Sequence, residues 1–367
     1  MQNKVKEVKS YTLLPGIDTL YFFINCDTEL YHKFYILVNS GDWQKFENYS
    51  FVYISKSSSK SYGVVGHMFD LFSSDGVCLC RAIFKDPDKQ KQIKNIYIML
   101  RGEAIYSYGI KLAIEKIVEI LNSIFGLTAN FMTMYPSRVD LNCFIGGFDF
   151  SKVKPECFAG HFYNSTELSK GHEIYEFNNR LGLESLYLGS KSSPLYFKIY
   201  NKKLEIEKNL DKLSAQIKKE YLIQNGFDFT KPIWNAEFTL KRDFLYQSGV
   251  LTLQSLFSFF KGLFQNTFDN LVFYGDDIAK INRYRANRNL SRLKPHPLWE
   301  QIVSYSRFDC IILIDGCLDY DSPLPKRLTV KKSKGMCEKW HKRQIIKYLR
   351  KSKDFGWDLK YLSEYVS

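Results

Sequence analysis

Short apolar runs separated by turn-forming residues dominate the first hundred residues of the chain. Each run is rich in aromatic and β-branched side chains, and Ser, Gly, Asp and Asn stand between the runs, so the pattern predicts β-strands joined by turns. The segment 109–126 (GIKLAIEKIVEILNSIFG) differs, because its apolar positions recur at helical spacing and it ends at a glycine suited to a helix C-cap. A β-rich segment followed by one long helix is an α+β unit. The strands predicted in this part are 17–25, 34–38, 50–54, 77–84 and 93–102.

A similar order of elements follows in the second part of the chain. Several predicted strands precede a charged helix over 202–224, and a further strand follows at 233–241. Later the pattern predicts mainly helices, at 251–274, 295–306 and 338–352. We therefore predict an α+β fold in which antiparallel sheets are flanked by helices, with two α+β halves and a helical C-terminal region. The strands predicted before the charged helix are 137–145, 172–177, 184–189 and 195–201.

Charge and aromatic content suggest a class of partner. The 367 residues carry a formal charge of +13, and 16% of them are aromatic, with 25 Tyr and 29 Phe. A basic and aromatic chain suits a polyanion whose bases can stack. The alternative is the codon bias of an AT-rich genome, which enriches Lys, Tyr and Phe without any such partner. Composition alone leaves both open.

Targeting and redox features are sparse. The N-terminus lacks an apolar run of signal-peptide length, and no run of 18 apolar residues occurs, so we expect a cytoplasmic protein with no membrane partner. The eight cysteines include no CxxC pair, which favours reduced, buried thiols over zinc ligands or disulfides.

Polar residues alternate along two of the predicted strands. In SRVDLNCFI the period of two places Arg138, Asp140 and Asn142 on one face. In IWNAEFTLK it places Asn235, Glu237 and Thr239 together, opposite an apolar face. The ordinary explanation is the solvent-facing side of an edge strand.

Carboxylates on separate strands suit a hard divalent cation, which polarises a phosphodiester and absorbs developing charge. Asp140, Glu237 and Asp18 are the candidates, although Asp18 could be a simple turn acid. A tyrosine nucleophile also fits such chemistry, because its oxygen forms a covalent phosphoester. Tyr200 lies on one strand face with Tyr196. From the residues alone, a tyrosine of the core or surface is the more ordinary interpretation. The lysines near it in sequence are Lys191, Lys198, Lys202 and Lys203.

Four motifs together resemble a known family. The segment 187–205 (YLGSKSSPLYFKIYNKKLE) is similar to the signature Y-x-G-x-R-x-S-x-x-x-x-R-I-Y-N-K-K-x-E of the Rep_trans family, which comprises rolling-circle plasmid replication initiators and the related MobT-type relaxases of integrative conjugative elements. SRVDL at 137–141 resembles the family's R-[IL]-D-[IL] strand, and WNAEFTLKR at 234–242 resembles its W-R-[VI]-E-x-x-[LF]-K-R strand. GIDTLYF at 16–22 looks like its N-terminal [IV]-D-W-L strand. The ordered set spans about two thirds of the chain.

The resemblance implies metal-dependent, site-specific nicking of one DNA strand at an origin. Tyr200 would attack the scissile phosphate and remain joined to the 5′ end, which frees a 3′ hydroxyl for rolling-circle replication or conjugative transfer. Asp140, Glu237 and Asp18 would hold Mg²⁺ or Mn²⁺. The implied partners are origin DNA, both duplex and single-stranded, a helicase, since the chain has no Walker loop, and a second copy of the chain. The residues expected to contact phosphate are Arg138, Lys191, Lys198, Lys202 and Lys203.

The same resemblance suggests how the chain is divided. Residues 1–130 would form an α+β half that binds DNA, and 131–325 the half that nicks it. A basic helical segment, 326–367, would follow.

Several positions depart from the family pattern. In the strand that begins with SRVDL, Phe144 stands where the family has a second acid. In the strand that begins with WNAE, Asn235 stands where the family has an arginine, and Thr239 stands where it often has a second acid. Lysines replace arginines at 191 and 198, and a lysine is a point charge where arginine offers a bidentate fork. The alternative function is therefore a sequence-specific DNA-binding regulator of the same fold that lacks nicking activity.

Overall fold

The structure, a computed structural model, describes most of the chain up to residue 325. Residues 1–326 form one compact unit, and the second unit, 327–367, lies outside the described residues together with the helix predicted at 338–352. The described stretches are 11–41, 51–57, 64–88, 95–160, 174–179, 182–287, 289–305 and 322–325.

One antiparallel sheet of ten strands organises the fold, in the order β2-β3-β4-β5-β1-β6-β11-β10-β9-β8. The strands of both predicted halves belong to it, because β1 pairs with β5 on one side and with β6 on the other. A short ribbon of β7 and β12 lies outside this sheet. The bounds are β1 (Thr12–Ile24), β2 (Phe51–Ser57), β3 (Gly66–Phe72), β4 (Cys78–Lys85), β5 (Ile96–Leu100), β6 (Met134–Gly146), β7 (Phe158–Gly160), β8 (Ile174–Asn179), β9 (Gly182–Leu188), β10 (Leu195–Asn201), β11 (Ile233–Lys241) and β12 (Leu271–Phe273).

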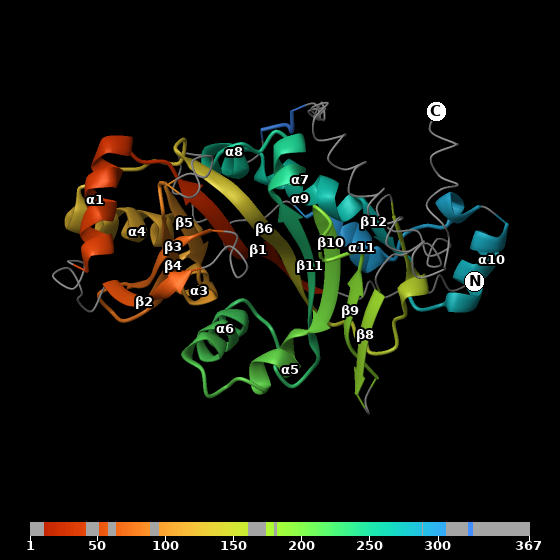
Figure 1. Ribbon diagram of the computed structural model, residues 1–367. Helices are drawn as coiled ribbons and strands as arrows, with labels where there is room; N and C mark the ends of the chain where they lie inside the picture. The colour runs from red at the N-terminus through yellow and green to blue at the C-terminus, as the bar shows by residue number, and fades with distance from the viewer. Residues whose placement is uncertain are drawn as a thin grey trace, which may run out of the picture. The chain divides into compact units, whose positions relative to one another are not determined.

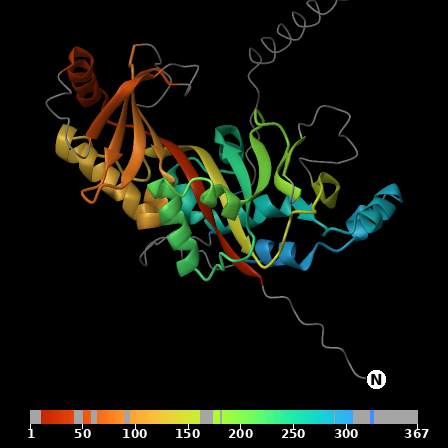
Figure 2. The same ribbon diagram turned by 90° about the horizontal axis from the view of Figure 1, so that it is seen from below.

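Helices cover both faces of this sheet (Figures 1 and 2). In Figure 1, α5 and α6 lie on one side of β1, β6 and β11, and α7, α8 and α9 lie on the other. The α+β fold with a large antiparallel sheet is therefore confirmed. The bounds are α1 (Thr28–Ser40), α3 (Gly102–Tyr108), α4 (Ile110–Phe125), α5 (Lys202–Glu207), α6 (Leu213–Gln224), α7 (Arg242–Gln247), α8 (Leu253–Ser258), α9 (Phe260–Asp269), α10 (Ile278–Ala286) and α11 (Pro297–Val303).

The two faces of the sheet differ in character. The apolar face packs against α1, α4, α8, α9 and α11 in one large core, in which Phe22, Leu141 and Phe238 are fully buried. The opposite side, here called the polar face, carries Asp18, Asp140, Asn142, Lys198, Tyr200, Asn235 and Glu237. A smaller apolar cluster from α3, α5 and α6 packs beside these residues, around Phe144. The strands that carry these polar residues therefore lie inside the sheet, and helices cover part of their polar face.

The predicted strand at 34–38 is wrong, because this segment lies within helix α1. Tyr31, Tyr35 and Val38 are buried at helical spacing, which the run of β-branched and aromatic residues concealed. The elements that were not predicted are the strands β3 and β7 and the helices α3, α7 and α10.

Two of the predicted helices are divided into shorter elements in the structure. The helix predicted over 202–224 is two helices, α5 and α6, and the one predicted over 251–274 is α8, α9 and β12. The helix predicted over 109–126 is α4, and it ends at Gly126, whose φ of 65° is left-handed.

Two further predictions concern membrane-spanning helices and the state of the cysteines. The described helices include none with the length and apolarity to cross a bilayer. The five cysteines at described positions are all free thiols, and Cys310, Cys317 and Cys337 lie outside the described residues.

Candidate active site

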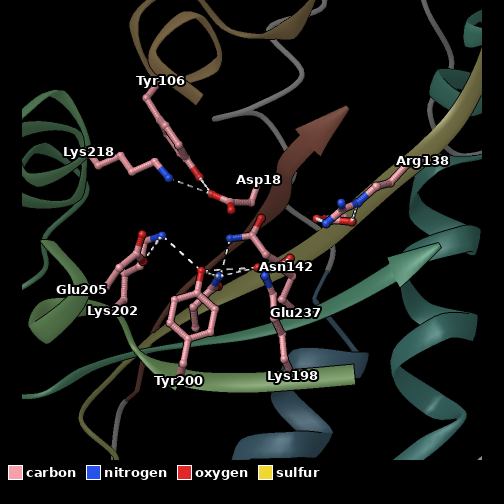
Figure 3. Close-up of polar contacts among 12 residues, drawn as sticks. Asp18, Tyr106, Arg138, Asn142, Lys198, Tyr200, Lys202, Glu205, Lys218 and Glu237 are labelled. Carbon is pink, nitrogen blue, oxygen red and sulfur yellow. Dashed lines mark hydrogen bonds and ion pairs between the residues drawn. The ribbon is translucent and has the colours of Figure 1, made fainter. Parts of the chain in front are cut away.

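Four neighbouring strands bring the predicted site residues together on the polar face. In the pairing of β10 with β11, Tyr200 lies opposite Asn235 and Lys198 opposite Glu237. In the pairing of β11 with β6, Glu237 lies opposite Asn142. The pairing of β1 with β6 shifts between Ile17 and Thr19, a β-bulge. The bulged residue is Asp18, whose side chain points to the same face (Figure 3).

The phenol oxygen of Tyr200 has three polar neighbours. Its hydroxyl donates to Glu237 Oε2 at 3.3 Å, and it accepts from Asn235 Nδ2 at 2.9 Å and Lys202 Nζ at 3.2 Å. The side chain is half-buried. Burial, followed by the charges of Glu237 and Asp18, raises the pKa of Tyr200 well above its ordinary value. At neutral pH the group is therefore a phenol.

Glu237 is the fully buried carboxylate at the centre of the cluster. It forms an ion pair with Lys198, whose Nζ lies 2.7 Å from Oε1, and accepts from Asn235 Nδ2 at 3.2 Å. Burial raises its pKa to about 8; the charges of Asp140 and Asp18 add to the rise, and Lys198 opposes it. The charges of two other carboxylates thus oppose the ionisation of Glu237.

Asp18 is held from the other side by two helices. Tyr106 on α3 donates a hydrogen bond to Asp18, and Lys218 Nζ on α6 lies 3.5 Å from its Oδ1 (Figure 3). Burial opposes ionisation of Asp18, but Lys218, Lys202 and the Tyr106 hydroxyl hold its pKa well below the ordinary value. Asp18 is therefore ionised at neutral pH, which the turn-acid interpretation does not explain.

Asp140 faces Arg138 on the same strand. The guanidinium donates to both carboxylate oxygens, Nε to Oδ1 at 2.9 Å and Nη2 to Oδ2 at 2.6 Å. Asp140 is 1% exposed on its side chain and Arg138 31%. Both of the oxygens that a cation would need are thus engaged by Arg138.

The four predicted lysines lie in different surroundings. Lys198 and Lys202 flank Tyr200, with Nζ atoms 5.3 and 5.2 Å from its ring centroid. Lys202 is fully buried and forms an ion pair with Glu205 at 2.7 Å. Lys203 pairs with Glu207 at 3.8 Å, and Lys191 lies 4.8 Å from the ring centroid of Tyr187. Two of the four lysines thus reach the tyrosine site. Lys202 contacts the oxygen of Tyr200, and Lys198 contacts Glu237, the carboxylate to which Tyr200 donates.

The departures from the family pattern have local explanations. Phe144 packs against Tyr106 and Phe227, and Lys202 Nζ lies 5.7 Å from its ring centroid, so an apolar ring occupies the place of an acid. Asn235 bridges Tyr200 and Glu237 and accepts from Asn142 Nδ2 at 3.1 Å. Thr239 is fully buried, and its hydroxyl has no hydrogen-bond partner within the part of the chain that the structure describes.

The oxygen donors fit a small hard cation in one particular set. No three carboxylate, histidine or cysteine side chains gather as metal ligands within the described stretches. Asn142 lies opposite Glu237 on the neighbouring strand, and its Oδ1 is buried and accepts no hydrogen bond from a described group. The carboxylates of Asp18 and Glu237, together with this amide oxygen, suit Mg²⁺ or Mn²⁺. Asp140 would have to release Arg138 to join them.

A cavity of about 560 Å³ opens onto this cluster. Asp18, Lys198 and Tyr200 form part of its wall, so the nucleophile candidate is accessible although it is half-buried. The other residues of the wall come from β9, from the end of β10, and from α5 and the loop after it: Glu184, Ser185, Tyr187, Asn201, Glu205, Lys208 and Asn209.

Sequence reasoning missed two residues that contact Asp18, namely Tyr106 and Lys218. They lie 88 and 200 positions away along the chain, in helices that show no motif. Alternation along strands could not find them, because a helix that covers a sheet contributes residues at spacings unrelated to the strands.

Replacing Lys218 by methionine tests how Asp18 is held. The change keeps most of the side-chain volume and removes the charge, so the pKa of Asp18 should rise toward its ordinary value. We expect a loss of about 1–3 kcal/mol in the free energy of unfolding at neutral pH, because a buried carboxylate loses its partner. Chemical denaturation measures the loss. The matched change Lys219→Met, one position along α6, should cost little, and equal losses would contradict a specific role for Lys218.

Comparison with known proteins finds similarity to solved structures only. No family model matches the chain, and no curated protein matches it. A solved structure of a rolling circle replication initiator protein from Geobacillus stearothermophilus is similar over 82% of this chain and 97% of that one, with 14% sequence identity and a TM-score of 0.41. The family indicated by the sequence motifs therefore stays a prediction.

Proposed function

We propose that this protein is a replication initiation protein or relaxase that nicks one DNA strand at an origin. The observation that carries the proposal is the setting of Tyr200. Its oxygen contacts Lys202, Asn235 and Glu237, and its side chain lines a cavity of about 560 Å³. A core tyrosine would need no such cavity, and a surface tyrosine would not be gathered with a buried carboxylate.

The chain's own residues can carry the transfer step. Tyr200 Oη attacks the phosphorus atom, and Glu237 Oε2, which already accepts its hydrogen, takes the proton when Glu237 is ionised, a form that becomes more populated as the pH rises toward its pKa of about 8. The bond from phosphorus to the 3′ oxygen breaks, and that oxygen leaves as a 3′ hydroxyl after taking a proton from water. The products are a 5′-phosphotyrosyl ester and a free 3′ end.

Charge around Tyr200 would stabilise the transition state. Lys198 lines the cavity beside the nucleophile, so negative charge that develops on the phosphate faces this cation, and the buried Lys202 would act through its hydrogen bond to the oxygen of Tyr200. Asp18, Glu237 and Asn142 would hold Mg²⁺ or Mn²⁺, which when bound polarises the phosphate. The raised pKa of Tyr200 means that proton removal must accompany attack.

A DNA-binding regulator without nicking activity is the second candidate. The observation that favours it is the fixed pairing of Asp140 with Arg138, together with Phe144 and Thr239 in place of acids. Such a protein would keep the cavity and bind DNA, but it would leave the strands intact.

Nicking of a supercoiled plasmid separates the two candidates. The substrate is a plasmid that carries this gene with its flanking DNA, since origins usually lie beside or inside the genes of their initiators. With Mg²⁺ or Mn²⁺ we expect conversion to the open-circular form, and none with a chelator. Binding of this plasmid without conversion under any metal condition would favour the regulator.

The salt dependence of DNA binding tests the role of Lys198. Each neutralised phosphate adds about 0.9 to the slope of log affinity against log salt for duplex DNA. If Lys198 contacts a phosphate from the cavity wall, Lys198→Ala should flatten the slope by about one. Lys203→Ala is the comparison, because Lys203 is the next lysine along the chain after Lys202 and is not among the residues that line the cavity. If Lys203→Ala changes the slope and Lys198→Ala does not, the bound DNA does not run along the cavity.

A further inference from the structure

The cavity beside Tyr200 is larger than the transfer step needs. A phosphate group and a cation would occupy its floor, where Asp18, Lys198 and Tyr200 lie. The remaining space extends along β9 toward α5 and its following loop. Its volume of about 560 Å³ lies within the range of pockets that enclose organic ligands, about 300–1,000 Å³. Something with more surface than a phosphate can therefore enter it.

Tyr187 supplies an aromatic surface in this space. In the pairing of β10 with β9, Tyr187 lies opposite Lys198, and Ser185 lies opposite Tyr200. Tyr187 is half-buried and lines the cavity, one strand away from the nucleophile. Its position is fixed by the sheet and not by a loop, since Leu186 and Leu188 on either side of it are fully buried.

Lysines lie near this ring. Lys191 Nζ lies 4.8 Å from the ring centroid of Tyr187, and Lys198 is its cross-strand neighbour. A third cation, Lys208, lines the cavity and pairs with Glu184. An aromatic ring with lysines nearby suits a base and the phosphates next to it in a single strand, although the wall also holds the carboxylates of Asp18, Glu184 and Glu205. A sugar or a peptide would not require that combination of ring and lysines.

We propose that this cavity receives one unpaired base of the DNA strand, from a nucleotide that flanks the scissile phosphate, and that the base stacks on Tyr187. The inference rests on the proposed function, and it adds the position at which the bound strand is recognised. Because a base must leave its pair to enter, the site takes single-stranded or locally opened DNA. Binding of the base would also fix the phosphate at Tyr200.

Binding of a short oligothymidylate, compared with a strand of the same length in which every base is absent, tests the stacking directly. Loss of one stacked base should weaken binding by about tenfold to a hundredfold. Tyr187→Ala should therefore weaken binding of oligothymidylate by that factor and leave binding of the abasic strand nearly unchanged. Tyr187→Phe keeps the ring and should bind as the parent does. Tyr246→Ala, at an exposed tyrosine on α7, is the control and should change neither affinity.

Photo-crosslinking locates the base without relying on affinity. An oligonucleotide with 5-iododeoxyuridine should crosslink to the tryptic peptide 181–191, in which Tyr187 is the sole aromatic residue. The crosslink should persist in Tyr187→Phe and disappear in Tyr187→Ala.

The outcomes separate this inference from nicking. Equal effects of Tyr187→Ala on both strands, no effect on either, or a crosslink confined to other peptides would overturn the base site and leave nicking standing. Failure of the parent to bind any single strand would overturn it as well. If the binding and crosslinking results support the base site but the parent forms no covalent product with origin DNA, the nicking proposal is wrong and the base site stands.

Discussion

Tyr200→Phe is expected to eliminate the covalent protein–DNA product while DNA binding and folding stay nearly unchanged. The substitution removes one oxygen and almost no volume, but that oxygen is the proposed nucleophile. Asn235, Lys202 and Glu237 each lose one hydrogen-bond partner, so a change in the free energy of unfolding of about 1 kcal/mol is expected. Incubation with labelled origin DNA and Mn²⁺, followed by a denaturing gel, reports the covalent product as a slowly migrating band.

Tyr196→Phe is the matched control for this experiment. Tyr196 lies on the same strand face four residues earlier, but it is 9% exposed and pairs opposite Thr239, away from Glu237. The variant should form the covalent product as the parent does. A product that persists in Tyr200→Phe and vanishes in Tyr196→Phe would mean that the motif alignment is out of step.

Glu237→Gln is expected to reduce nicking by about a hundredfold to ten-thousandfold, the usual contribution of a positioned general base. The amide keeps the shape of the side chain, but it cannot take the proton of Tyr200 or balance the charge of Lys198. Binding of origin DNA should remain, because it depends on phosphate contacts and base edges. The measurement is the initial rate of conversion of the supercoiled plasmid, beside a binding assay with the same DNA.

Two further amide substitutions separate proton transfer from metal binding. Asp18 does not contact Tyr200 and would act only as a ligand, so Asp18→Asn should lower nicking and raise the Mn²⁺ concentration needed. Asp140→Asn should abolish nicking if Asp140 is a ligand, and full activity in that variant would remove it from the site. Activity lost in Glu237→Gln but kept in both other variants would contradict a shared metal.

The strands that carry the site could be predicted closely from the sequence. The segments predicted at 195–201 and 233–241 match β10 and β11, because strict alternation and the family motifs indicate the same register. The convergence of Tyr200 with Glu237 follows from that register, since the two strands are neighbours. Helix α1 was mistaken for a strand where aromatic residues satisfy either period.

The surroundings of the site could not be predicted in the same way. The burial of Lys202 depends on α6 folding back over the polar face, which no local pattern indicates. The pairing of Asp140 with Arg138 was also not foreseen, although alternation had placed both on one face. Tyr106 and Lys218 reach Asp18 through contacts that are distant along the chain, and only the packing of helices on the sheet reveals them.

Mass spectrometry of the covalent product tests the central claim most directly. Trypsin separates the two tyrosines of β10, since Tyr196 falls in the peptide 192–198 and Tyr200 in the peptide 199–202. After the protein has reacted with origin DNA and Mn²⁺ and the DNA has been digested with nuclease, the peptide 199–202 should carry the mass of a 5′-linked nucleotide. A nucleotide found on the peptide 192–198, or on no tyrosine peptide although the plasmid is nicked, would contradict the account.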